Sequence, residues 1–133
     1  MQRTALTVGE ALPTLRKHIT QEQLQCYADA SGDHNPLHLD PEFAAKTQFG
    51  GTIAHGMLVL AFLSEMLTAA FGQAWPESGR LKIRFRAPAR PGDEVICGGK
   101  VTMVEGGRVK CEVECRSGSG EVLVSGEAEV SVA

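Results

Sequence analysis

The run from Gly56 to Phe71 constrains the fold of this chain more than any other segment. Nearly every side chain in it is apolar, and the only polar interruptions are Ser64, Glu65 and Thr68. A membrane-spanning helix needs about 20 residues with few or no charges, whereas this run is shorter and contains a glutamate. A helix that is apolar on nearly all sides is buried inside a protein. We therefore predict a buried helix over 56–71 that ends at Gly72.

The chain after Pro76 alternates between apolar and polar residues, a pattern typical of strands with one buried face. Short glycine-containing turns separate the strands, which predicts antiparallel pairing. Only the helix over 56–71 is apolar enough to cover the sheet. The predicted fold class is therefore α+β, with a curved antiparallel sheet wrapped around a central apolar helix. With 133 residues, the chain is long enough for one core and too short for two, so we expect residues 1–133 to form a single domain.

The segment before the buried helix contains two helix-start signals. Thr20 and Gln23 form a capping box, which predicts a helix that runs to about Ala30 and is stopped by Gly32. Asp40 followed by a proline predicts a second short helix over 40–46. A weaker alternation over 15–19 predicts a strand.

The loop between these helices reads Ser31-Gly32-Asp33-His34-Asn35-Pro36-Leu37-His38. Pro36 moves the preceding residue out of the helical region and stiffens the loop. We expect the backbone to run extended from Asn35 to Leu39, with Leu37 and Leu39 pointing inward and His38 pointing elsewhere.

Asp33 and His38 are the candidate acid/base pair. A carboxylate and an imidazole can share one water, and such general acid/base assistance contributes about 10²–10⁴ in rate. The alternative from spacing alone is that Asp33 is a turn residue and His38 a loop histidine with a structural partner.

Gly56 begins the buried helix, where an amide without an intrahelical partner lies at the positive end of the helix dipole. Such an amide can bind a developing oxyanion, although a glycine there can also serve only a tight turn. Ser64 is a lone hydroxyl on an apolar helix, and such a hydroxyl commonly bonds to the carbonyl four residues back. His55, immediately before Gly56, is interpreted as bracing the loop.

A basic row follows the helix, on one strand and at its exit: Lys82, Arg84, Arg86 and Arg90. Such rows are usually solvated surface, and the alternative is a site for a phosphate-bearing handle on a ligand. The formal net charge of −3 argues against binding to nucleic acid, because no excess of Lys and Arg is available to displace counterions. We expect neither a nucleic-acid partner nor a membrane.

The four cysteines show neither a zinc-ligand spacing nor a disulfide framework, so we predict reduced thiols that serve packing. The amino-terminal residues lack a basic and then apolar signal pattern, and the segment from Thr4 to Leu12 is mixed and polar. A cytoplasmic location is the resulting expectation.

The loop motif, together with Ala54-His55-Gly56-Met57, resembles the MaoC-like, or (R)-specific, enoyl-CoA hydratases (hydratase 2) of the hotdog fold. The similarity extends to Phe85-Arg86-Ala87-Pro88 and Pro91-Gly92-Asp93, and covers nearly the whole chain. The sheet-wrapped helix predicted above is the architecture of a hotdog domain.

The resemblance implies reversible syn addition of water to a trans-2-enoyl-CoA, which gives an (R)-3-hydroxyacyl-CoA. Asp33 and His38 match the catalytic pair of that family, Gly56 matches the amide that binds the thioester oxygen, and Ser64 matches a hydroxyl near the site. Asn35 and Arg86 are the further candidates for contact with the substrate. No metal and no separate cofactor are implied, because coenzyme A is part of the substrate. A homodimer or a larger homo-oligomer is implied, because the sites of this family lie at a subunit interface.

Three other functions stay open at this point. A hotdog acyl-CoA thioesterase shares the oxyanion site at the helix end but usually relies on a carboxylate without this histidine. A dehydratase that acts on acyl-carrier-protein thioesters would use the same residues on another carrier. A non-catalytic acyl-CoA-binding module would bind without turnover.

Overall fold

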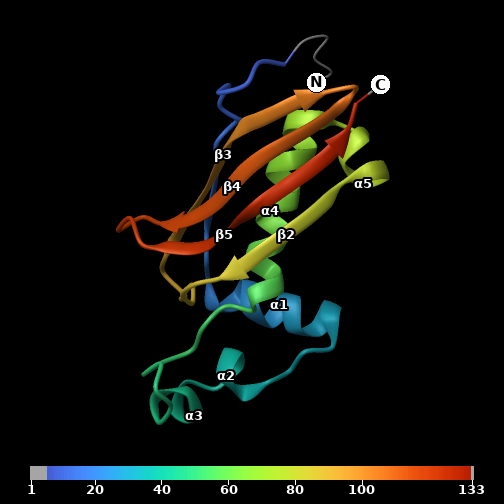
Figure 1. Ribbon diagram of the computed structural model, residues 1–133. Coiled ribbons are helices and arrows are strands. Elements are labelled where there is room, and N and C mark those ends of the chain that lie inside the picture. Colours follow the sequence, from blue (N-terminus) through green and yellow to red (C-terminus); the bar gives the residue numbers. More distant parts are fainter. Residues whose placement is uncertain (1–5, 133) are drawn as a thin grey trace.

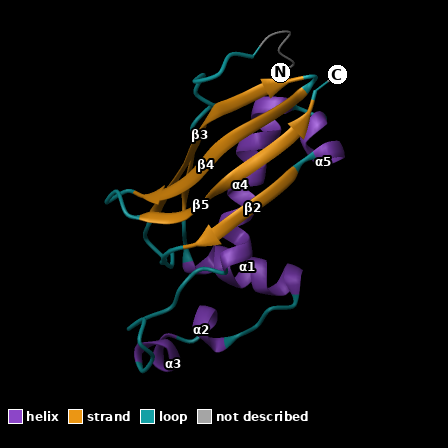
Figure 2. Ribbon diagram, in the orientation of Figure 1, coloured by secondary structure: helices purple, strands orange, loops and turns teal. Residues whose placement is uncertain are grey.

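A curved antiparallel sheet forms one layer of the protein, and the long helix α4 packs behind it (Figures 1 and 2). The computed structural model describes residues 6–132, so the first residues of the amino-terminal segment lie outside the described part. The sheet has five strands in the order β1-β3-β4-β5-β2. The strands are β1 Leu15–His18, β2 Arg80–Phe85, β3 Glu94–Glu105, β4 Arg108–Ser117 and β5 Val122–Ser131.

Helix α4, Gly56–Phe71, is confirmed with the predicted bounds and is capped by Gly72. One face of the helix is buried against the sheet through Val59, Phe62, Leu63, Met66, Leu67 and Phe71. The rest of the helix surface is more exposed than the apolar run predicts, and Met57 is 56% exposed. The predicted α+β fold with a central apolar helix is confirmed, and the sheet and α4 share one hydrophobic core.

The helices before α4 lie beyond one end of the sheet, at the bottom of Figure 1. They are α1 Gln21–Ser31, α2 Pro36–Leu39 and α3 Pro41–Ala45. The predicted capping box of α1 is present, and Gly32 ends the helix in the left-handed region at φ 82°. Glycine adopts this conformation without the steric penalty that a side chain brings. The position of Gly32 therefore releases the chain into the loop that holds Asp33.

Two local expectations are wrong. The segment after Pro76 does not start as a strand, because the short helix α5, Ala74–Ser78, comes first. Trp75 of α5 is 7% exposed and packs into the core, which explains why the chain turns here before β2 begins. On β5 the strict alternation also breaks, because the register between β4 and β5 shifts beside Val124. As a result both Leu123 and Val124 are buried.

Three of the cysteines are buried packing residues, as predicted: Cys97, Cys111 and Cys115. Cys26 is exposed on α1. Within residues 6–132, none of the helices is both long enough and apolar enough to cross a membrane.

Candidate active site

The loop around Asp33 is shaped by Asn35, which caps the short helix α2. The Asn35 side-chain oxygen accepts a hydrogen bond of 2.9 Å from the Leu37 amide, and Pro36 occupies the first turn. Asn35 itself has ψ 128°, as expected for a residue before proline. The expected extended backbone from Asn35 to Leu39 is nevertheless wrong, because the cap turns the chain into a helical turn directly after Asn35.

His38 lies on α2 and is held by both its side chain and its backbone. Its Nδ1 lies 2.8 Å from the Ile53 carbonyl oxygen, and its own carbonyl accepts a hydrogen bond of 2.7 Å from Gln21 of α1. Because a carbonyl oxygen can only accept, Nδ1 carries a proton. In the neutral ring the lone pair is therefore on Nε2, the nitrogen that faces Asp33.

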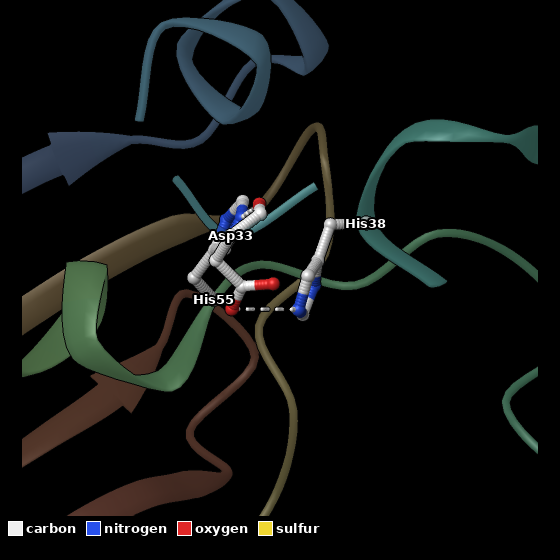
Figure 3. Close-up of side chains that lie close together, drawn as sticks. All are labelled: Asp33, His38 and His55. Atoms are coloured by element: carbon white, nitrogen blue, oxygen red, sulfur yellow. Dashed lines mark hydrogen bonds and ion pairs between the residues drawn. The ribbon is translucent and has the colours of Figure 1, made fainter. Parts of the chain in front are cut away.

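Asp33 and His38 meet as the sequence predicts, across a gap (Figure 3). The distance from Asp33 Oδ2 to His38 Nε2 is 3.9 Å, too long for a direct hydrogen bond. A single water oxygen can lie about 2.8 Å from both atoms across such a gap, within ordinary hydrogen-bond distance. The other Asp33 oxygen accepts from the Asn35 amide at 3.2 Å, which fixes the carboxylate in the loop.

The surroundings of the two groups differ. The His38 side chain is 12% exposed and the Asp33 side chain is 52% exposed. The pair therefore has one member anchored in the protein and one member at the surface, in contact with solvent.

His55 lies next to the pair, although the sequence indicated only that it braces the loop. It is 2% exposed, and its Nε2 donates a hydrogen bond of 3.1 Å to the backbone carbonyl of Asp33. Its ring stacks on the His38 ring at a centroid distance of 3.9 Å. The interpretation that His55 braces the loop is supported by these contacts.

A cavity of about 340 Å³ opens beside the pair. Its wall includes His38 from α2, Gly56 at the start of α4, and Phe85 and Arg86 at the end of β2. The rest of the lining is mostly apolar and consists of Phe49, Ile53, Ala54, Val59, Ala87, Pro88, Ala89 and Val124. The amino end of α4, with its unpartnered amides and positive dipole end, therefore faces the same cavity as His38.

The structure brings Asp33 and His38 together and places His38 in the same cavity wall as Gly56 and Arg86, but it places Ser64 elsewhere. The Ser64 hydroxyl accepts a hydrogen bond of 2.9 Å from the Trp75 indole. It lies about 12 Å along the helix axis from Gly56, at 1.5 Å per residue, and it is not among the residues that line the cavity. Asn35 is occupied as a helix cap, also outside the cavity lining, so contact of Ser64 or Asn35 with a substrate stays a prediction.

One ligand atom from each of Asp33, His38 and His55 lies within 4.8 Å of the others, a separation at which a metal ion can be considered. The rings of His38 and His55 are stacked with an interplanar angle of 25°. Lone pairs of stacked rings run side by side and do not converge on one ion. This geometry favours a bridging water over a metal, and the expectation of no metal stays a prediction.

An antiparallel sheet around one long helix, with an acid/base pair at the amino end of that helix, defines a hotdog-fold protein with a site for acid/base chemistry. The chain belongs to the family of the MaoC like domain, whose family model matches residues 3–123.

Relatives across this family are similar over most of the chain. The (R)-specific enoyl-CoA hydratase of Aeromonas caviae is 34% identical, with 99% of each chain covered. The 3-hydroxybutyryl-CoA dehydratase of Methylorubrum extorquens is 36% identical over 89% of this chain and 76% of that protein. The solved structure of the (R)-hydratase from A. caviae, described as involved in PHA biosynthesis, superposes with a TM-score of 0.85 at 31% identity. That superposition covers 98% of this chain and all of the other.

Proposed function

We propose that this chain is an (R)-specific enoyl-CoA hydratase, a hydro-lyase that reversibly adds water to trans-2-enoyl-CoA. The observation that carries the proposal is the separation of 3.9 Å between His38 Nε2 and Asp33 Oδ2, with His38 in the wall of a mostly apolar cavity. Gly56 lies at the same cavity. The names of the relatives similar over most of the chain, a hydratase and a dehydratase of acyl-CoA thioesters, support the same reaction.

The pair acts on one water. His38 Nε2 accepts a proton from the water as the water oxygen bonds to C3 of the enoyl thioester, while Asp33 accepts a hydrogen bond from the second proton and orients the water. The proton held on Nε2 then passes to C2. Because the oxygen and the proton arrive from the same face, the addition is syn, and the reverse sequence removes water from the 3-hydroxyacyl thioester.

The amino end of α4 stabilises the charge that develops on the thioester oxygen. As the water adds to C3, negative charge moves to this oxygen, and the Gly56 amide is placed to donate to it. No hydrogen bond among residues 6–132 uses the Gly56 amide, and His55 supplies no side-chain cap to the helix.

Arg86 is the candidate contact for the coenzyme A part of the substrate. It lines the cavity, and its Nε donates a hydrogen bond of 2.7 Å to Ser125 on the neighbouring strand β5. That bond holds the guanidinium beside the cavity, and its other nitrogens can bind a phosphate. No separate cofactor is part of the proposal.

One assay separates the proposed reaction from the thioesterase alternative. The protein is mixed with crotonyl-CoA, and the absorbance of the enoyl thioester and the concentration of free thiol are followed together. Loss of the enoyl absorbance without thiol release is the expected result. Thiol release would indicate a thioesterase, and binding without either change would indicate a binding module. Repeating the assay with the crotonyl thioester of acyl carrier protein compares the two carriers.

We also propose a homodimer and a cytoplasmic location. Strand β2 is at the edge of the sheet, with a partner strand on one side only among the described residues. Phe85 at its end is 54% exposed and Met57 of α4 is 56% exposed, so apolar surface is open beside the cavity. Sedimentation of the purified protein tests the dimer, and a monomer at micromolar concentration would contradict it.

The proposed cytoplasmic location is supported by the buried free thiols, because free thiols are typical of a reducing compartment.

A further inference from the structure

Three rings from three different segments form a column beside the acid/base pair. The ring of His55, immediately before α4, stacks on the ring of His38 on α2, with 3.9 Å between the ring centroids. The ring of Tyr27 on α1 also packs against His55, with 4.8 Å between the centroids and an interplanar angle of 53°. The column therefore connects α2, which carries the proposed base, to two elements that belong to the body of the protein.

His55 also reaches the other member of the pair. Its Nε2 lies 3.1 Å from the carbonyl oxygen of Asp33, so this nitrogen carries a proton and donates. One buried side chain thus contacts both the ring of His38 and the backbone of Asp33, and all three residues lie close together in Figure 3.

Packing alone does not explain a histidine at this position. Its Nδ1 is buried and has no hydrogen-bond partner in the described part of the chain, although the residue is only 2% exposed. An unpaired buried polar atom destabilises a folded protein, and each such atom in a native structure calls for an explanation. A phenylalanine would fill a similar volume and stack on His38 without this loss. The other ring nitrogen, Nε2, does have a hydrogen-bond partner, which is the backbone carbonyl of Asp33.

We propose that His55 is a positioning residue for the hydration reaction, with two separable actions. Its ring holds the His38 imidazole in the orientation that aims Nε2 at Asp33, and its Nε2–H holds the Asp33 backbone so that the carboxylate stays across the gap. This inference rests on the proposed function, because it assigns His55 to the same site. A displacement of about 1 Å in a catalytic group can cost about 10²-fold in rate.

Two substitutions separate the two actions. His55→Phe keeps a ring against His38 and removes the donor to Asp33. His55→Gln keeps a donor at about the position of Nε2 and removes the ring, and His55→Ala removes both. The matched control is His18→Gln on β1, since the His18 side chain is 73% exposed and lies outside the cavity lining.

The expected result is a fall in kcat of about tenfold to hundredfold for His55→Phe, with KM for crotonyl-CoA changed less than about twofold. The unfolding midpoint of His55→Phe is expected to stay close to that of the wild type, because loss of the hydrogen bond to the Asp33 carbonyl offsets removal of the buried unpaired nitrogen. His55→Ala is expected to lose more activity than either His55→Phe or His55→Gln. A wild-type kcat in folded His55→Phe and His55→Ala, or a change confined to KM, would overturn the inference.

A second readout does not depend on turnover. The proton on His38 Nδ1, which donates to the Ile53 carbonyl, is observed by NMR in protein labelled with ¹⁵N-histidine. Its exchange with water is expected to be at least about tenfold faster in His55→Gln and His55→Ala, where the stack is lost, than in wild type. Unchanged exchange would overturn the role of the ring. If the wild type itself fails to hydrate crotonyl-CoA, the proposed function fails, whereas the exchange measurement still tests the positioning.

Discussion

Gly56→Ala tests whether the amino end of α4 takes part in the reaction. A methyl group built on Gly56 lies 3.0 Å from Cε1, 3.2 Å from Cζ and 3.4 Å from Cδ1 of the Phe85 ring. The favourable separation of carbon atoms is about 3.5–4.0 Å, so the ring or the helix start has to move by several tenths of an ångström. Both residues line the cavity, and the change therefore falls on the proposed oxyanion site.

The effect of this substitution on stability is small. Phe85 is 54% exposed, so its ring can swing toward solvent at low cost. Gly56 is not among the glycines with positive φ, and alanine fits its backbone without strain. A compatible Gly→Ala change contributes about 0.4–1 kcal/mol through the unfolded state, which offsets the displacement of the ring. We expect the free energy of unfolding to change by less than about 1 kcal/mol in either direction.

The effect on activity is large, because the methyl group lies beside the donating amide. Alanine keeps the amide N–H, but its methyl group obstructs the approach of the thioester oxygen to that amide. Loss of one oxyanion donor costs about 10²–10³ in kcat in enzymes that use one, and we expect the obstructed contact to cost up to this amount in crotonyl-CoA hydration. The matched control is Gly98→Ala on β3, where an added Cβ meets no atom within 4 Å. The control is expected to keep wild-type activity. Hydration by Gly56→Ala at the wild-type rate, in a folded protein, would refute the role assigned to this end of α4.

Three further outcomes are expected. Arg86→Ala raises KM for crotonyl-CoA more than it lowers kcat. Steady-state kinetics with crotonyl-pantetheine, which lacks the phosphates, should show no such rise in KM. A fall confined to kcat would contradict the assignment of Arg86 to the phosphates. Gln21→Ala removes the hydrogen bond to the carbonyl of His38, and urea unfolding should show a loss of about 1 kcal/mol; an unchanged free energy of unfolding would argue against this anchor. In thiol titration at pH 8, Cys26 should react at once and the buried thiols only after unfolding, because the reagent cannot reach Cys97, Cys111 and Cys115 in the folded protein. Burial also raises the pKa of Cys111 to about 11, which lowers the reactivity of that thiol further. Rapid reaction of all the thiols in the native protein would contradict the buried placement.

The parts of the fold that the sequence predicts are those with local causes. The apolar run marks α4, the capping box and Gly32 bound α1, and period-two alternation marks the long strands. Strand order does not follow from such patterns. The order β1-β3-β4-β5-β2 depends on pairing between segments far apart in the sequence, and it places the end of β2 beside the start of α4.

The members of the candidate acid/base pair could be predicted from the sequence, and the geometry around them less so. The loop motif identifies Asp33 and His38, and the structure places them 3.9 Å apart. The signals for α2 are also present in the sequence, since Asn35 is a helix cap and Pro36 a first-turn proline. Proline restricts only the residue before it, so a helical turn can begin directly after Asn35. The contacts of His55 were out of reach, because they join residues 22 positions apart through a backbone carbonyl.

The central claim is that Asp33 and His38 act as one unit on a shared water. The most direct measurement is the rate of crotonyl-CoA hydration by Asp33→Ala, His38→Ala and the double variant, side by side with wild type and with circular dichroism to verify folding. We expect each single variant to lose about 10²–10⁴ in kcat, and the double variant to lose little more than either, because residues that act together give non-additive losses. Near-normal activity in either folded single variant would contradict the account, as would losses that multiply in the double variant.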